Sequence, residues 1–265
     1  MTQLEGPVSL PEGAGRAVII MPAHNEAANL PHVLNELRHV APDLDVAVID
    51  DYSSDETPAV ARQLGAQVIS LPCNLGYGGA VQTGFKYAAE RGYDFAVMMD
   101  ADGQHDPSYI RALLAPVMAG EADVCIGSRF LGRADYAVGW AKRLGMRAFA
   151  ALATRFTHRP VTDPTSGFQA LNRRVLCFFA RDNYPTDYPD TDTLLTLHYA
   201  GLRVQEVPVV MRERIAGFSM HRSWKVIYYL FKMMLSIVVI LIRHRTQQAA
   251  TCFPDPRGPD PRGAR

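Results

Sequence analysis

The stretch FAVMMDADGQHDP, residues 95–107, contains the pattern that decides the fold. Its first five residues are apolar and do not alternate with polar ones, which predicts a strand buried on both faces, as in a parallel sheet. Asp100 and Asp102 follow this run directly. Asp106 is then the expected N-cap, and Pro107 the first residue, of a helix. The stretch therefore predicts a strand, a polar turn and a helix in succession.

The same rhythm continues on both sides of this stretch. We expect strands at Ala17–Met21, Val46–Ile49, Gln67–Leu71, Phe95–Met99 and Val124–Gly127. Helices are expected between them, at Glu26–His39, Thr57–Leu64, Gly79–Arg91 and Pro107–Ala119. Strands that alternate with helices predict an open, mostly parallel α/β sheet with flanking helices.

The alternation is less regular in the second half of the chain. We expect a helix over Trp140–Phe156, a strand at Phe168–Leu171, a helix near Thr191–Ala200 and an extended stretch over Val204–Met211. The domain prediction follows from this pattern. It comprises a flexible N-terminus (1–16), an α/β domain (17–222), an apolar and basic helix (223–245) and a disordered tail (246–265).

The composition is that of an ordinary globular protein. The 265 residues are 48% hydrophobic and 20% charged, which excludes a wholly disordered, collagen-like or coiled-coil chain. Basic and acidic residues number 27 each, so net charge gives no reason to expect a nucleic-acid partner. The four cysteines have no paired spacing, which predicts free thiols in a reducing compartment and no zinc site. Residues 1–16 contain no apolar run, so we expect no signal peptide.

Polar residues follow the first four expected strands. They are Pro22–Glu26, Asp50–Asp55, Asn74–Gly79 and Asp100–Gln104. The carboxyl ends of parallel strands lie at one edge of a sheet, where ligands bind, and several carboxylates there repel one another unless a cation is present. Asp100 and Asp102, with Gln104 as a third oxygen ligand, suit Mg²⁺ or Mn²⁺, which usually take substrate phosphates as further ligands. The alternative is that Asp100 and Asp106 only cap the following helix.

The glycines in Gly76-Tyr77-Gly78-Gly79 leave two interpretations open. Their backbone N–H groups are suited to binding a phosphate at a helix N-terminus, or they only shape a tight turn. Because they follow the third expected strand, they are not the dinucleotide-binding fingerprint, which belongs to the first strand and helix.

Seven motifs, in consistent order from Ala17 to Ser219, resemble family 2 glycosyltransferases with the GT-A fold. Four of them are the polar strand ends given above. The other three, Gly127–Phe130, Asp163–Phe168 and Arg214–Ser219, are similar to the dolichyl- or polyprenyl-phosphate sugar synthase branch. The resemblance implies an inverting transfer of a sugar, mannose or glucose, from a nucleotide-diphosphate sugar to a polyprenyl phosphate, with Mg²⁺ or Mn²⁺ as cofactor.

By motif position, the resemblance also implies residue roles. The donor-binding residues would be Pro22, His24, Glu26, Asp50, Asp51, Gly76, Asp100, Ala101, Asp102, Arg129 and Arg214. The metal ligands would be Asp100, Asp102 and Gln104, and the acceptor side would include Asp163, Ser166, Gly167 and Ser219. The sequence departs from the family pattern at two places. His24 replaces the usual Tyr or similar residue, and Met220 stands where a Lys is common, so one expected phosphate contact differs.

The expected catalytic residues are Asp102, Arg129, Asp190 and Asp192. The metal and Arg129 would stabilise the departing nucleoside diphosphate. An acceptor phosphate is already an anionic nucleophile and needs no general base. With a hydroxyl acceptor, which is the alternative function, Asp190 or Asp192 would be the base. The alternative role for these two carboxylates is capping of the following helix.

Val226–Ile242 is an apolar run of seventeen residues, near the lower limit for crossing a bilayer. Basic residues stand at both ends and Lys232 lies inside. This pattern favours a helix that lies on the anionic cytoplasmic leaflet, so that the protein is peripheral or monotopic. The alternative is a core helix or the interface of a homo-oligomer.

Two further hypotheses assign the protein a non-enzymatic function. A phosphoacceptor receiver module would explain Asp50 and Asp51, but it requires a Lys at a later strand end where Ser128 and Arg129 stand. A membrane scaffold that keeps the fold without turnover is the second, and failure to transfer any nucleotide sugar would favour it.

Overall fold

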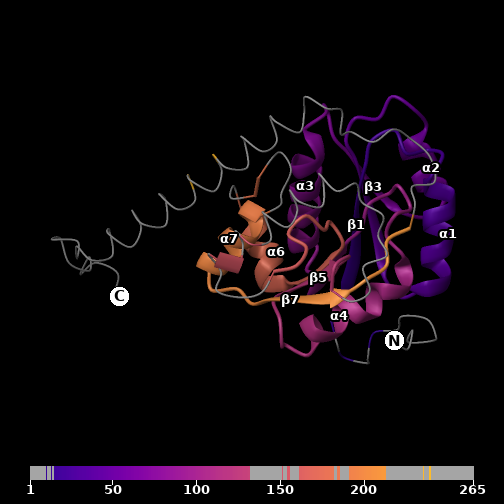
Figure 1. The fold of residues 1–265 in the computed structure, drawn as a ribbon. Coiled ribbons are helices and arrows are strands. Elements are labelled where there is room, and N and C mark those ends of the chain that lie inside the picture. Colours follow the sequence, from indigo (N-terminus) through magenta and orange to yellow (C-terminus); the bar gives the residue numbers. More distant parts are fainter. Residues whose placement is uncertain are drawn as a thin grey trace, which may run out of the picture. The chain divides into compact units, whose positions relative to one another are not determined.

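Seven strands form a mixed sheet in the order β3-β2-β1-β4-β6-β5-β7 (Figure 1). They are β1 (Ala17–Ala23), β2 (Asp45–Asp50), β3 (Gln67–Ser70), β4 (Phe95–Met98), β5 (Val124–Ser128), β6 (Gln169–Asn172) and β7 (Val204–Pro208). β1 to β4 pair in parallel, and so do β5 and β7. Among the strands that the structure describes, only β6 is antiparallel to its neighbours, β4 and β5. The mostly parallel sheet predicted from the sequence is confirmed.

The computed structural model describes residues 10, 13, 15–131, 151, 154–155, 161–181, 184–185, 191–212, 235 and 239. The chain divides into two units, residues 1–219 and 220–265. The sheet and all the helices named below belong to the first unit. In the second unit, Leu235 and Val239 are helical and exposed. No helix in the described part of the chain combines the length and the apolar character needed to cross a membrane.

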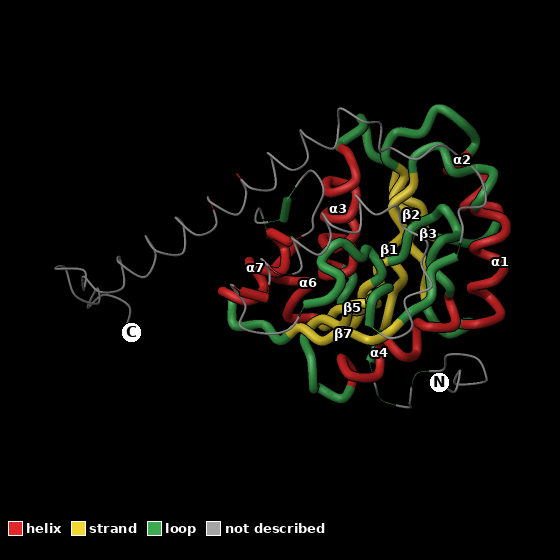
Figure 2. The backbone as a smooth tube through the Cα atoms, in the orientation of Figure 1, coloured by secondary structure: helices red, strands yellow, loops and turns green. Residues whose placement is uncertain are grey.

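Helices cover both faces of the sheet. They are α1 (Leu30–Val40), α2 (Thr57–Gln63), α3 (Gly76–Glu90), the 3₁₀ helix η1 (Pro107–Tyr109), α4 (Ile110–Met118), α6 (Arg173–Phe179) and α7 (Thr191–Tyr199). One core joins α1, α2 and α4 to one side of β1, through Ile19 and Met21. A second core joins α3, α6 and α7 to the other side, through Val18 and Ile20. Figure 2 shows α1 and α3 on opposite sides of β1 to β3.

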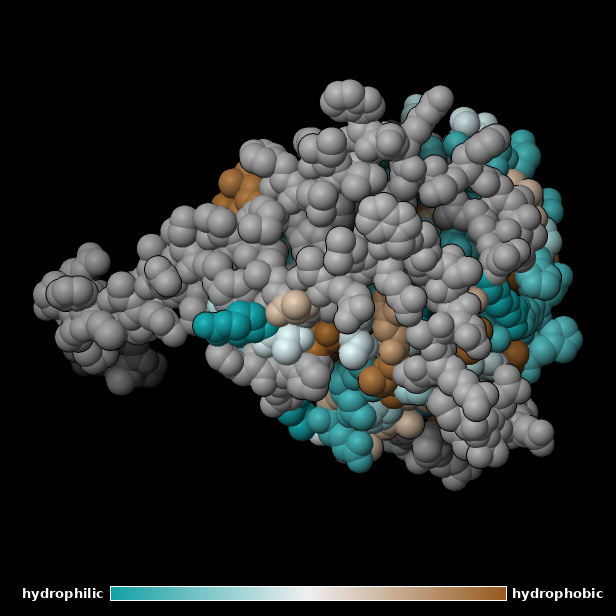
Figure 3. Space-filling view, in the orientation of Figure 1, coloured by the Kyte–Doolittle hydropathy of each residue, from teal (hydrophilic) through white to brown (hydrophobic). Residues whose placement is uncertain are grey.

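Burial follows the position of each strand in the sheet. Every residue of β1 is buried because this strand has neighbours on both edges and helices on both faces. The sequence pattern predicts the same for Gln67–Leu71, but β3 is only partly buried. This expectation was wrong because β3 is an edge strand of the sheet, with a neighbour on one side only. On the face shown in Figure 3, hydrophilic side chains gather over α1, whose apolar residues face the core.

Two helices begin elsewhere than the sequence predicts. α1 begins at Leu30 rather than Glu26, because the residues from His24 onward contact the loop after β2. α3 begins at Gly76, so the glycine-rich motif forms its first turn. The predicted N-cap at Asp106 is confirmed, since its Oδ1 accepts a hydrogen bond of 2.9 Å from Ser108 N.

Other predictions lie wholly or partly outside the described residues. They concern the helix over Trp140–Phe156, of which only three residues are described, the helix over 223–245 and the two terminal segments. The antiparallel strand β6 and helix α6 fill part of the region in which the sequence pattern is irregular. Helix α6 is not among the helices predicted from the sequence.

Candidate functional site

The polar segments after β1 and β2 are bound to each other. Asp51 N donates to the carbonyl of Ala23 over 2.8 Å, and His24 Nδ1 donates to the carbonyl of Asp51 over 2.8 Å. Asn25 has a φ of 57°, and its backbone N donates to Ser53 Oγ over 3.0 Å. These contacts bring two of the predicted donor-binding motifs to the same edge of the sheet, as expected for parallel strands.

The buried carboxylates Asp50 and Asp51 each hold a turn. Asp50 Oδ1 accepts from Ser53 N over 3.1 Å, and Asp51 Oδ1 accepts from Leu75 N over 2.7 Å. The second bond ties the residue before α3 to the end of β2. The sequence predicts that both aspartates bind the donor, and this role stays a prediction. Pro22 is buried, and Gly76 opens α3 with a φ of 78°.

Glu26 and Asp55 complete this part of the site. Glu26 N donates to Thr57 Oγ1 over 2.8 Å, while its carboxylate accepts from Asn29 Nδ2. Burial would raise the pKa of Asp55, but hydrogen bonds donated by Thr57 and Ala27 outweigh it and lower that pKa below its ordinary value. Asp55 is therefore a carboxylate at neutral pH and fixes the loop after β2.

The carboxylates Asp100 and Asp102 lie at the end of β4. Asp100 Oδ1 accepts a hydrogen bond of 2.9 Å from the Tyr77 hydroxyl, and 31% of its side chain is exposed. Asp102 is buried, and its Oδ1 accepts from Gln104 N over 3.0 Å. Ala101 between them is also buried. The Asp100 side chain is thus partly exposed, whereas Asp102 is buried and fixed by the hydrogen bond from Gln104.

His105 holds the backbone of Asp100. Its Nδ1 accepts from Asp100 N over 3.0 Å, so the proton of the neutral ring is on Nε2. Burial lowers the pKa of His105, which keeps the ring neutral. The ring stacks on Phe168, with centroids 4.8 Å apart, and Nε2 lies 3.8 Å from Asp100 Oδ2. His105 is therefore a neutral group wedged between the turn after β4 and the loop before β6.

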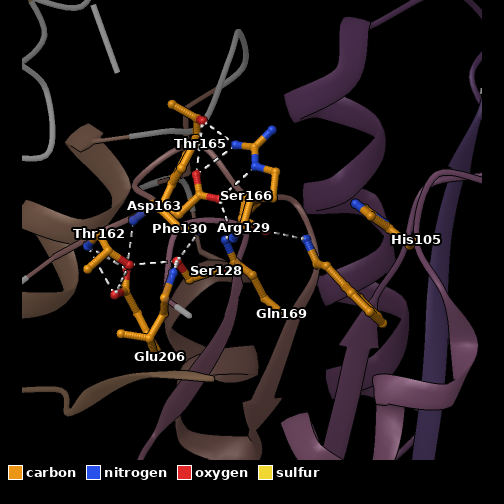
Figure 4. A network of polar contacts seen from close by, with 12 residues as sticks. His105, Ser128, Arg129, Phe130, Thr162, Asp163, Thr165, Ser166, Gln169 and Glu206 are labelled. Carbon is orange, nitrogen blue, oxygen red and sulfur yellow. Dashed lines mark hydrogen bonds and ion pairs between the residues drawn. The ribbon is translucent and has the colours of Figure 1, made fainter. Parts of the chain in front are cut away.

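Arg129 and Asp163 form a buried ion pair between the end of β5 and residues 161–168, here called the 161–168 loop (Figure 4). Arg129 Nε and Nη2 donate to the two oxygens of Asp163 over 2.6 and 2.7 Å, and Arg129 N donates to Oδ2 over 3.0 Å. Arg129 Nη2 also donates to Thr165 Oγ1 over 2.6 Å. The resemblance assigns Arg129 to a phosphate, a role that stays a prediction. The structure places its guanidinium on Asp163.

Glu206 anchors the same loop to β7 (Figure 4). Its carboxylate accepts from the backbone N atoms of Thr162 and Asp163, each over 3.0 Å, and from Thr162 Oγ1 over 2.7 Å. Ser128 Oγ lies 2.6 Å from Thr162 Oγ1. The 161–168 loop is therefore fixed to two strands by charged and hydroxyl groups.

The predicted acceptor-side residues Ser166 and Gly167 are in this loop. Ser166 is buried, and its carbonyl accepts from Gln169 Nε2 over 2.8 Å. A Cβ atom added to Gly167 would lie 2.8 Å from the Tyr77 hydroxyl and 3.5 Å from Asp100 Oδ2. The structure thus brings the predicted acceptor side next to a predicted metal ligand.

Four predicted site residues have a different outcome. Asp190, Arg214 and Ser219 lie outside the described residues. Asp192 is buried in the first turn of α7, where its Oδ1 accepts from Thr193 N over 2.8 Å. A role as general base stays a prediction.

Met211 and Arg212, just before the predicted Arg214 motif, lie beside the turn after β4. Arg212 N donates to the carbonyl of Gln104 over 2.8 Å, and Met211 forms a β-bridge with His105. The Arg212 guanidinium pairs with both oxygens of Glu36 over 2.7 and 2.8 Å and with Asp106 over 3.0 Å. Residues 211 and 212, which directly precede the predicted motif, are therefore fixed to the turn after β4.

The profile of glycosyl transferase family 2 matches residues 18–179, which contain the strand ends described above. The chain belongs to this glycosyltransferase family. The polyprenol monophosphomannose synthase of Mycolicibacterium smegmatis is 33% identical over 214 residues, 77% of this chain and 80% of that protein. The undecaprenyl-phosphate mannosyltransferase of Micrococcus luteus is 33% identical over 219 residues, 77% of this chain and 86% of that protein. The family predicted from the motifs is confirmed.

Solved structures confirm the fold of this family 2 glycosyltransferase. The mannosyl-3-phosphoglycerate synthase of Rubrobacter xylanophilus has a TM-score of 0.65 at 19% identity, covering 94% of this chain and 80% of that chain. The glucosyl-3-phosphoglycerate synthase of Mycobacterium tuberculosis, solved with Mn²⁺ and uridine-diphosphate-glucose, has a TM-score of 0.61 at 22% identity, covering 91% and 81%. These likenesses show a GT-A-like α/β fold.

The donor atoms at the end of β4 fit a hard divalent cation. Among the described residues, no three His, Cys, Asp or Glu side chains converge closely enough to hold an ion by themselves. Mg²⁺ or Mn²⁺ bound with a diphosphate needs only one or two carboxylates from the protein, because phosphate oxygens and water supply the other ligands. Asp100 and Asp102 are two carboxylates of the kind that this binding mode uses, and their role as metal ligands stays a prediction.

The sequence motifs do not mark Tyr77, His105 or Glu206 as site residues. Tyr77 lies within the glycine-rich motif and His105 directly follows Gln104, so both are adjacent to residues that the motifs do mark. Glu206 lies in an ordinary strand pattern, and nothing near it in the sequence points to the 161–168 loop. Its role follows only from the parallel pairing of β5 with β7.

Proposed function

We propose that this protein is an inverting glycosyltransferase that moves mannose or glucose from a nucleotide-diphosphate sugar to a polyprenyl phosphate. The observation that carries this proposal is the 33% identity, over 77% of the chain, to a polyprenol monophosphomannose synthase and to an undecaprenyl-phosphate mannosyltransferase. The strand ends with the donor and metal candidates supply a suitable site at one edge of the sheet.

The chemistry divides among the residues as follows. Asp100 and Asp102, with Gln104 nearby, would hold Mg²⁺ or Mn²⁺, which when bound neutralises charge on the departing diphosphate. Asp50, Asp51, His24 and Glu26 form the part of the edge assigned to the nucleoside. The acceptor phosphate attacks as an anion, so the side chains need only bring it into line with the sugar. The buried Arg129–Asp163 pair contributes by holding the 161–168 loop in place.

The test is product analysis with purified protein. Nucleotide-diphosphate mannose and glucose, with guanine or uracil as base, are each supplied with Mn²⁺ and a polyprenyl phosphate. We expect label from one of these sugars in a lipid that mild acid cleaves, because a glycosyl phosphate is acid-labile. Label found only on hydroxyl acceptors would replace the proposal with the alternative in which Asp190 or Asp192 is the base.

We also propose that the protein meets its acceptor at the cytoplasmic leaflet. The support is the apolar run Val226–Ile242 with basic residues at both ends. Each basic residue near an anionic surface contributes roughly 1 kcal/mol to binding. We therefore expect the protein to sediment with anionic vesicles, to bind neutral vesicles less and to be released in part by high salt.

The matched control for this membrane proposal is a chain that ends at Ser223. We expect it to stay in the supernatant while still binding the nucleotide. If the full-length protein binds neither anionic nor neutral vesicles, the apolar run belongs to a core or to a homo-oligomer interface.

A further inference from the structure

The Tyr77 hydroxyl lies between two parts of the candidate site. It comes from the first turn of α3 and donates to Asp100 Oδ1 over 2.9 Å. Gly167 adjoins the same hydroxyl, since a Cβ on Gly167 would lie 2.8 Å from the hydroxyl oxygen and 3.5 Å from Asp100 Oδ2. This separation is closer than van der Waals contact allows, so a side chain larger than glycine would displace the hydroxyl.

Asp100 is fixed at two points by groups that contact the 161–168 loop or its end. Tyr77 holds one carboxylate oxygen and adjoins Gly167. His105 accepts the backbone hydrogen bond of Asp100 and stacks on Phe168. A shift of the loop at Gly167 and Phe168 therefore acts on Asp100 through both contacts.

The loop itself is held firmly at its other end. Asp163 is fully buried and binds the Arg129 guanidinium with both oxygens, while Glu206 accepts two backbone hydrogen bonds from the loop. These contacts fix residues 162 and 163 to β5 and β7. A ligand that displaces Gly167 or Phe168, at the other end of the loop, therefore acts on Tyr77 and His105, which adjoin these two residues.

We propose that Tyr77 is a positioning residue that couples the 161–168 loop to Asp100. The hydroxyl sets the orientation of the Asp100 carboxylate toward a divalent cation, and the space left by Gly167 keeps the hydroxyl in place. This inference deepens the proposed function because it assumes that Asp100 binds the metal. By linkage, a ligand that shifts the loop alters metal affinity, and the metal alters the affinity for that ligand by the same factor.

The test is a double-mutant cycle with Tyr77→Phe and Gly167→Ala. The readout is the Kd of Mn²⁺ in the presence of uridine or guanosine diphosphate, whichever the wild type binds, measured by calorimetry. We expect Tyr77→Phe to weaken Mn²⁺ binding by about tenfold, as is typical when a hydrogen-bond partner of a metal ligand is lost. Gly167→Ala should weaken it similarly by displacing the hydroxyl.

The decisive result is in the double variant. Phenylalanine has no hydroxyl for the new methyl group to displace, so the double variant should bind Mn²⁺ about as well as Tyr77→Phe alone. A merely structural role for each residue would give effects that multiply. Tyr87→Phe, on the same helix, is the matched control and should leave the Kd unchanged. Thermal unfolding of each variant shows that the fold is intact.

The outcomes separate this inference from the proposed function. Multiplicative effects, an unchanged Kd in Tyr77→Phe, or no Mn²⁺ binding by the wild type would each overturn the coupling. If the wild type transfers sugar to polyprenyl phosphate in any of these cases, the proposed function stands without it. If the cycle is non-additive but no polyprenyl phosphate is glycosylated, the coupling stands and the acceptor assignment fails.

Discussion

Replacement of Asp102 by Asn is expected to lower sugar transfer by at least ~100-fold, or about 2.7 kcal/mol of transition-state stabilisation. Asp102 is buried at the end of β4 and accepts a hydrogen bond from Gln104 N. The amide oxygen of Asn can accept the same bond, so the turn should survive. What is lost is the negative charge that the proposed site offers to a divalent cation, so the effect falls on transfer rather than on folding.

The measurement is kcat/KM for the nucleotide sugar, together with the melting temperature of each variant. Asp106→Asn is the matched control, since Asp106 lies on the same segment but caps η1 and pairs with Arg212. We expect the control to cost some stability and little activity. Full activity in excess EDTA, or an Asp102→Asn variant that transfers sugar normally, would contradict the metal assignment.

The strands and their order along the chain could be predicted because each apolar run has a local cause. Val46–Ile49 and Phe95–Met99 are buried except for their partly buried first residues, and Asp50 and Asp100 directly follow these runs at the edge of the sheet. The convergence of four motifs then follows from parallel pairing alone, without knowledge of any side-chain contact. Local sequence therefore determines where the candidate site lies.

The partners within the site could not be predicted in the same way. Arg129 and Asp163 are 34 residues apart, and Thr162 and Glu206 are 44 apart. These pairs meet only because β6 inserts antiparallel between β4 and β5 and because β7 lies beside β5. Their spacing in the sequence has no period that a helix or strand would produce. Phosphate binding is a reasonable expectation for an isolated Arg129, but its ion pair depends on tertiary structure.

Replacement of Asp163 by Ala is expected to lower the free energy of unfolding by about 3–5 kcal/mol. The Asp163 carboxylate is fully buried, and the Arg129 side chain is 13% exposed. Removing the acid leaves a guanidinium charge with little access to water, in addition to the loss of the bond to Arg129 N. Breaking a buried pair in this way costs far more than removing an exposed one.

Urea denaturation at equilibrium measures this loss, with Arg16→Ala as the matched control. Arg16 pairs with Asp45 at 3.2 Å, but both side chains are more than half exposed, so the control should cost ~1 kcal/mol or less. Arg129→Met combined with Asp163→Ala should be more stable than Asp163→Ala alone, because the guanidinium charge is removed together with the carboxylate that compensates it. A loss of stability in Asp163→Ala no larger than in the control would mean that the Arg129–Asp163 pair contributes little to holding the 161–168 loop, which Glu206, Ser128 and Thr165 also anchor.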